Sequence, residues 1–133
     1  MDAAARHAMH AHARDAYPHE CCGAMFGTTS DGVRVVSTLP LPNTTEEGPR
    51  RRFLVQPRDY QVAEREADAR SLELLGFYHS HPDHPAVASA HDLAHAWPSF
   101  HYVIVSVVSG RVAETRNWKL DEDRARFSEI PMT

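Results

Sequence analysis

The sequence predicts an α/β (α+β) fold in which a mixed β-sheet is flanked by two longer helices and one short helix. Three patterns support this. Residues 2–16 are rich in Ala and free of Gly and Pro, a second helical pattern begins at Pro57, and residues 102–108 form an almost continuous apolar run. A chain of 133 residues suits one hydrophobic core, so we expect a single domain over residues 1–133.

The first half of the chain is expected to hold a helix, a hairpin and a second helix. Pro18 ends the Ala-rich helix, and the turn-forming segment 27–32 separates an apolar run from a β-branched run. Three prolines mark residues 40–49 as a loop. From Pro57 onward, apolar residues recur along one side of a helical pattern. The expected elements are helix 2–16, strands 23–26, 33–39 and 52–55, and helix 57–72.

In the second half, the run Leu74 to His79 predicts a buried strand. Pro82 and Pro85 stiffen the loop that follows, and Ser89 is expected to cap a short helix. Residues 102–108 predict a central strand, because apolar residues continue without alternation. The expected elements are strand 74–79, loop 82–88, helix 89–97, and strands 102–108, 112–120 and 124–130.

Composition and charge exclude several classes of protein. The net charge is -4, without the concentrated basic face of a nucleic-acid-binding protein. No apolar run is long enough for a membrane helix, and the N-terminus lacks the apolar core of a signal peptide, so we expect a cytoplasmic protein. The two cysteines, Cys21 and Cys22, are adjacent, which disfavours a disulfide between them. We expect packing roles for them, with a redox or metal-modulating role as the alternative.

His79 and His81 are the first candidates for chemistry. They end the predicted strand 74–79, where residues i and i+2 point to the same face, so both imidazoles can reach one ion while Ser80 points away. Imidazole and carboxylate groups bind divalent metals, and three protein ligands are typical of a catalytic zinc site. A carboxylate, Asp92, follows near the start of the short helix.

Each further candidate has an ordinary alternative role. Asp92 could complete a helix cap instead of binding a metal. His91 and His95 are rivals as ligands, because they lie at i and i+4 of one helical face, and His84 is a third. Ser89 is most simply a helix N-cap, although its hydroxyl could also stabilise an oxyanion.

Glu20 is the best candidate for the base that a hydrolytic zinc site needs. It stands just before the apolar strand 23–26, where a charged residue is unusual, and an exposed loop residue is the alternative. His19 and Glu20 do not begin a His-Glu-x-x-His motif, since position 23 is Gly. The Pro-Cys-x-x-Cys motif of zinc deaminases is also absent.

Taken together, these residues resemble the JAMM motif of the MPN+ metalloprotease family. That motif is a Glu, then His-x-His-Pro, then Ser-x-x-Asp, and it is matched by Glu20, by residues 79–82, and by Ser89 with Asp92. The segments 18–23, 77–82 and 103–106 are similar to the small prokaryotic branch of the family, and the likeness spans about residues 1–130.

The resemblance implies a curved mixed sheet flanked by helices, similar to cytidine deaminases. It implies that His79, His81 and Asp92 bind one zinc ion. Glu20 would take the proton of the attacking water and pass it to the leaving amine, and Ser89 would stabilise the tetrahedral oxyanion.

It also implies a substrate class. Family members cleave amide bonds after the Gly-Gly tail of ubiquitin-like proteins, and the small prokaryotic branch is associated with ubiquitin-like sulfur carriers. We therefore expect a zinc metallopeptidase that acts on a carrier of this kind, for example to release cysteine from a carrier–cysteine adduct. The alternatives are a non-catalytic MPN scaffold and a zinc hydrolase of a small amide.

Overall fold

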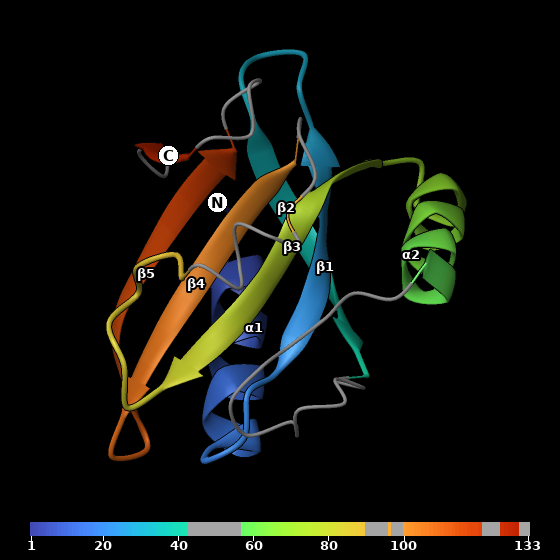
Figure 1. The fold of residues 1–133 in the computed structure, drawn as a ribbon. Helices are drawn as coiled ribbons and strands as arrows, with labels where there is room; N and C mark the ends of the chain where they lie inside the picture. Colours follow the sequence, from blue (N-terminus) through green and yellow to red (C-terminus); the bar gives the residue numbers. More distant parts are fainter. Residues whose placement is uncertain (43–56, 90–95, 97–99, 121–125, 131–133) are drawn as a thin grey trace.

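The computed structural model describes residues 1–42, 57–89, 96, 100–120 and 126–130. Within this part of the chain, six strands form one curved sheet in the order β2-β1-β3-β4-β5-β6 (Figure 1). Strands β3 and β4 are parallel and all other neighbours are antiparallel, which confirms the predicted mixed sheet. The elements are α1 (Ala3–Ala16), β1 (Cys22–Thr28), β2 (Arg34–Leu41), α2 (Pro57–Ala69), β3 (Glu73–Pro82), β4 (His101–Val108), β5 (Arg111–Leu120) and β6 (Phe127–Ile130).

Several boundaries differ from the predictions by one to three residues. β2 continues through Pro40 to Leu41, because Pro40 lies on an edge strand where a missing N–H is tolerated. α2 ends at Ala69 rather than at Leu72, and Ser71 then adopts a positive φ of 57°. β3 runs on to Pro82, held by parallel pairing with β4. The predicted strand 52–55 and almost all of the predicted helix 89–97 lie outside the described residues.

The two faces of the sheet carry separate cores. α1 covers one face, behind the sheet in Figure 1, where Met9 is fully buried, and α2 lies beside β3 on the other. The core under α1 contains Ala5, Met9, Ala13, Cys21, Met25, Val35, Leu75, Tyr78, Val103, Val105 and Val107. The opposite core contains Cys22, Ala24, Phe26, Leu41, Ala63, Ala67, Phe77, Ala96, Tyr102 and Leu120. Cys21 and Cys22 therefore face opposite sides, as neighbours on an extended chain do.

A β-bulge in β3 determines to which side of the sheet the side chains in the C-terminal half of the strand point. Met25 pairs with Gly76 but Phe26 pairs with Leu74, so Leu75 is an extra residue on β3. Leu75 packs in the core under α1, and Phe77, two residues later, packs in the opposite core. The alternation that continues from Phe77 places odd-numbered residues of β3 on the face opposite α1.

Contacts between side chains hold α1 against the sheet. His12 Nδ1 lies 2.6 Å from the hydroxyl oxygen of Tyr78, and His10 Nε2 lies 2.8 Å from Oγ1 of Thr115 on β5. The Tyr78 ring occupies the space where a Cβ on Gly23 would stand. None of the helices in the described part of the chain is both long enough and apolar enough to cross a membrane.

Candidate metal centre

His79 and His81 converge at the end of β3. Their Nε2 atoms lie 3.1 Å apart, with the ring centroids separated by 4.9 Å. Ser80 points to the opposite face, where its hydroxyl accepts a hydrogen bond of 2.9 Å from the backbone N–H of Cys21. His79 is fully buried and His81 is partly exposed, so the pair stands between the core and the surface.

The loop after β3 constrains the His81 ring. His81 Nδ1 lies 2.8 Å from the carbonyl oxygen of Pro85. A carbonyl can only accept, so Nδ1 carries the hydrogen of the neutral ring and Nε2 keeps its lone pair. A backbone carbonyl on the second nitrogen is the usual partner of a metal-binding imidazole.

Glu20 belongs to the same face of the sheet. Cys22 pairs with His79, and the N–H of Ser80 donates to the carbonyl of Cys21 at 3.0 Å, so the antiparallel pairing continues in register beyond β1. If the pairing continued for one more residue, Glu20 would stand opposite His81. Glu20 is only 6% exposed. The expected alternative of an exposed loop residue is therefore wrong for its side chain.

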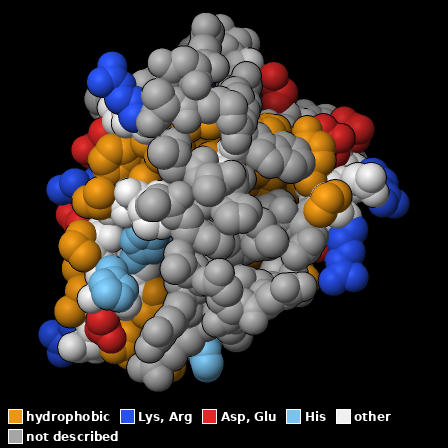
Figure 2. All heavy atoms as spheres, viewed as in Figure 1, with side chains coloured by type: hydrophobic (Ala, Val, Ile, Leu, Met, Phe, Trp, Pro, Cys, Tyr) orange, Lys and Arg blue, Asp and Glu red, His pale blue; other side chains and the backbone are white. Residues whose placement is uncertain are grey.

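Of the remaining candidate residues, the structure describes Ser89 and His84 but not Asp92, His91 or His95. The side chain of Ser89 is exposed. His84 is exposed, and its carbonyl accepts a hydrogen bond of 2.5 Å from the Ser106 hydroxyl. Figure 2 shows histidine side chains gathered near the lower ends of β3 and β4, beside hydrophobic side chains.

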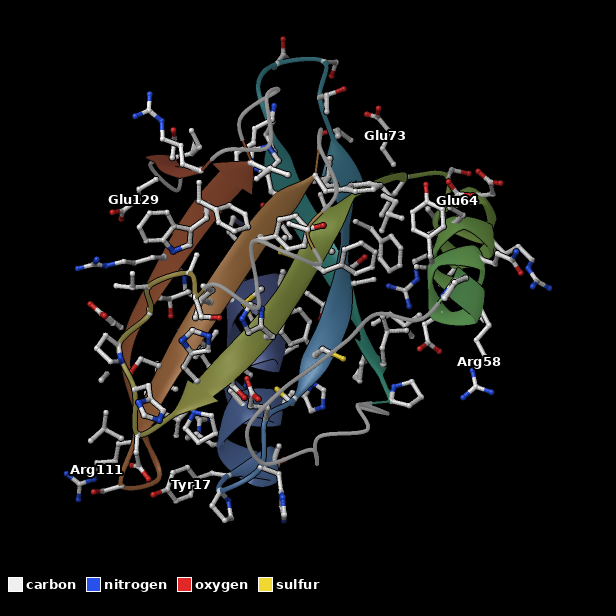
Figure 3. The ribbon with its side chains drawn as sticks, in the orientation of Figure 1. Tyr17, Arg58, Glu64, Glu73, Arg111 and Glu129 are labelled. Atoms are coloured by element: carbon white, nitrogen blue, oxygen red, sulfur yellow. The ribbon has the colours of Figure 1, made fainter. Side chains whose placement is uncertain are left out.

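Sequence reasoning did not find the contact between Tyr17 and Asp83. The Tyr17 hydroxyl lies 2.8 Å and 3.0 Å from the two carboxylate oxygens of Asp83, and Asp83 Oδ1 also accepts from the backbone N–H of Ser109. Tyr17, at the lower end of the sheet in Figure 3, thus joins the segment before Glu20 to the residue after Pro82. The available signal was the Tyr-Pro-x-Glu segment itself, which offers a hydroxyl three residues before the candidate base.

The donors that are described suit a divalent cation such as zinc. The Nε2 atoms of His79 and His81 face each other at 3.1 Å, and imidazole nitrogens set this close together are suited to bind one cation. Among the described residues, no three His, Cys, Asp or Glu side chains come close enough together to hold a metal ion. Asp92, the third expected ligand, lies outside the described residues.

Comparison with known proteins defines the class. Residues 2–121 match the family described as prokaryotic homologs of the JAB domain, so the chain belongs to this family. It is a small prokaryotic member of the JAMM/MPN group and a hydrolase of the JAMM type. The resemblance drawn from Glu20, residues 79–82, Ser89 and Asp92 is thereby confirmed at the level of the family, which is generally zinc-dependent.

Particular relatives agree with this assignment. The chain is 34% identical over 129 residues to a desampylase from Haloferax volcanii, covering 93% of this chain and 90% of the relative. The solution structure of a protein from Desulfitobacterium hafniense superposes with a TM-score of 0.81 at 30% identity, covering 96% of this chain and 86% of that one. A JAB1/MPN domain protein from Archaeoglobus fulgidus, with a TM-score of 0.57 and 17% identity over 96% of this chain and 89% of that chain, shares the fold.

Proposed function

We propose that this chain is a zinc metallopeptidase that hydrolyses the amide bond after the Gly-Gly C-terminus of a ubiquitin-like sulfur-carrier protein. Release of cysteine from a carrier–cysteine adduct is one such reaction. The observation that carries the proposal is the pair of Nε2 atoms, 3.1 Å apart, on a chain that matches the family over residues 2–121. The desampylase relative supports hydrolysis of an amide bond to a ubiquitin-like protein.

In this proposal His79, His81 and Asp92 hold the zinc ion. When bound, zinc supplies a Lewis acid that lowers the pKa of a water to near neutrality. Fixed imidazoles suit that task, since His79 is fully buried and the Pro85 carbonyl restrains the ring of His81.

Glu20 is the proposed general base and Ser89 the proposed oxyanion donor. Glu20 is buried, and it lies two residues before Cys22, which pairs with His79. From there its carboxylate would take the proton of the attacking water and then give it to the leaving amine. Ser89 is exposed, and in this proposal its hydroxyl would donate to the developing oxyanion of the substrate carbonyl.

Metal content and cleavage, measured on the same samples, test these roles. Wild-type protein should hold about one zinc per chain. Glu20→Gln should keep its zinc and lose cleavage by about 10²–10⁴-fold, because the amide cannot accept the proton. His81→Ala should lose both. His84→Ala and Glu64→Gln are matched controls, because both side chains are exposed, and Glu64 lies on α2 away from the pair (Figure 3).

The substrate is tested with one carrier protein in three forms. A carrier ending in Gly-Gly-Cys tests the proposed adduct. A carrier joined through Gly-Gly to a lysine of another protein tests the alternative of a protein conjugate, which the name of the desampylase relative suggests. A carrier whose Gly-Gly is replaced by Ala-Ala is the control. If neither Gly-Gly substrate is cleaved by the zinc-loaded protein, the proposal is wrong and a scaffold or small-amide hydrolase takes its place. A Glu20→Gln protein that loses its zinc would contradict the role of Glu20.

A further inference from the structure

Side chains of β5 hold the centre of the loop that follows His81. Ala86 is fully buried in this loop. Its backbone N–H donates to Glu114 Oε1 at 2.9 Å, and its carbonyl accepts from the indole N–H of Trp118 at 3.0 Å. Both polar groups of one buried peptide segment are thus satisfied by two side chains of the same strand, four residues apart.

A β-bulge in β5 directs Glu114 toward this loop. Ser106 pairs with Glu114 but Val107 pairs with Val112, so Ala113 is an extra residue. Val112 packs against the core under α1. Without the extra residue Glu114 would share that face, since residues two apart on a regular strand point the same way. The bulge turns Glu114 to the face that carries the imidazole pair.

The loop in turn holds His81. Pro85, whose carbonyl lies 2.8 Å from His81 Nδ1, is joined directly to Ala86. A shift of Ala86 would therefore move the carbonyl that fixes the tautomer and the angle of the His81 ring. A continuous path of contacts runs from Glu114 and Trp118 through the loop to the ring of His81.

We propose that Glu114 and Trp118 are positioning residues that, through Ala86 and the Pro85 carbonyl, keep Nε2 of His81 turned toward His79. This deepens the proposed function, because it rests on His81 as a metal ligand. Partners of this kind outside the ligand set change metal affinity by about 10–100-fold when removed. The hydrogen bonds of Ala86, rather than the charge of Glu114, carry the effect.

Zinc affinity, measured by competition with a chelating dye, tests this on the folded full chain. Glu114→Ala should weaken zinc binding by about 10-fold or more. Glu114→Gln keeps an oxygen that accepts from the Ala86 N–H, so it should remain within about 3-fold of wild type. Trp118→Phe keeps an aromatic side chain, although a smaller one, and loses the N–H donor, so it should weaken binding in the same direction. This variant also tests the inference if Glu114→Ala does not fold.

Glu129→Ala is the control. It removes a carboxylate 4.0 Å from Arg116, the residue that also pairs with Glu114 at 3.3 Å, and leaves the acceptor of the Ala86 N–H in place. It should leave the zinc affinity unchanged. Unaltered affinity in folded Glu114→Ala and Trp118→Phe would overturn the inference, as would a loss in Glu114→Gln equal to that in Glu114→Ala. A wild-type protein that binds no zinc would overturn it as well.

Activity separates this inference from the proposed function. Because affinity is read from the metal alone, a wild-type protein that binds zinc and cleaves no carrier refutes the proposed substrate and leaves the positioning result standing. With a cleaved substrate, Glu114→Ala should lower kcat more than it raises KM, because substrate contacts are unchanged while the ligand geometry is disturbed.

Discussion

Cys22 lies directly opposite His79 in the antiparallel pairing of β1 with β3. Opposite residues of such a pair share a face, so the thiol packs beside a proposed metal ligand. Its sulfur lies 3.8 Å and 3.6 Å from the carbonyl oxygens of Leu41 and Pro42. Cys21 packs in the core under α1. Both cysteines act as small apolar core residues, which favours the packing role expected for them.

The first prediction is that neither thiol reacts with a thiol reagent in the folded protein. Burial raises the pKa of Cys21 to about 11 and that of Cys22 to about 12, with Glu20 among the charges that add to both shifts. At about pH 8 the thiolate, which is the reactive form, is therefore scarce. Colorimetric titration should find two thiols in denaturant and none reacting promptly before it is added. Rapid labelling of either one in native protein would favour the redox alternative.

The second prediction concerns Gly76, which allows β3 and β4 to approach closely. A Cβ at this position would overlap the backbone carbonyl of His101, and neither backbone can move without disturbing the parallel pairing. Gly76→Ala should lower the free energy of unfolding by about 3 kcal/mol, measured by urea titration. Gly110→Asn is the control, because Gly110 has a φ of 82° and open space around it. It should cost about 1 kcal/mol or less. Equal losses in both variants would contradict the argument.

The helices and strands were predicted well from the sequence, but the bulges that switch side chains from one side of the sheet to the other were not. A period of two residues is sufficient to put His79 and His81 on one face of a strand, and the apolar run 102–108 identifies the central strand β4. The extra residues Leu75 and Ala113 could not be predicted, because a bulge depends on the register with a neighbouring strand. Without the bulge in β5, the sequence offers no reason to connect Glu114 with the loop after His81.

The site shows the same limit. The segment that carries Glu20 meets β3 through pairing between residues about 60 positions apart in the chain, which no local pattern reveals. From its chemistry and sequence position alone, Glu20 was more simply interpreted as an exposed loop residue. Only the resemblance to the JAMM motif favoured a role as the general base. The motif carries information about tertiary structure that spacing within one segment does not.

The third prediction concerns Arg70, which joins the end of α2 to β2. Its guanidinium donates to Ser37 Oγ and to the Thr38 carbonyl, both at 3.1 Å, and its carbon atom lies 4.8 Å from the centre of the Phe26 ring. Arg70→Ala should lower the free energy of unfolding by about 1–3 kcal/mol in urea titration. Both bonds to β2 come from Nη1, while Nε donates to Glu66 at 2.9 Å. Arg70→Lys keeps the charge but has a single nitrogen that cannot reach both sides, so it should recover only part of the loss. Full recovery would show that the charge alone matters.

The last prediction is that the protein loses stability as the pH falls below about 6.5. Burial lowers the pKa of three imidazoles, those of His10, His12 and His101. Nearby positive charges lower two of these values further: Arg6, Arg14 and His7 act on His10, and Lys119 acts on His101. The folded state therefore binds protons less readily than the unfolded state. Above about pH 6.5 these imidazoles are neutral in both states, and below it the unfolded state takes up protons first, so the free energy of unfolding falls until the folded values are reached.

Urea titrations between about pH 7.5 and about pH 5 should reveal this loss. His12→Asn should flatten the dependence, because it removes an imidazole that burial keeps neutral beside the Tyr78 hydroxyl. His84→Gln, at an exposed position outside α1, should leave the slope close to that of wild type. Stability that rises on acidification, or equal slopes in wild type and His12→Asn, would show that His12 does not couple protonation to the packing of α1. Because Tyr78 immediately precedes His79, that coupling would also link the packing of α1 to the strand that carries the proposed metal ligands.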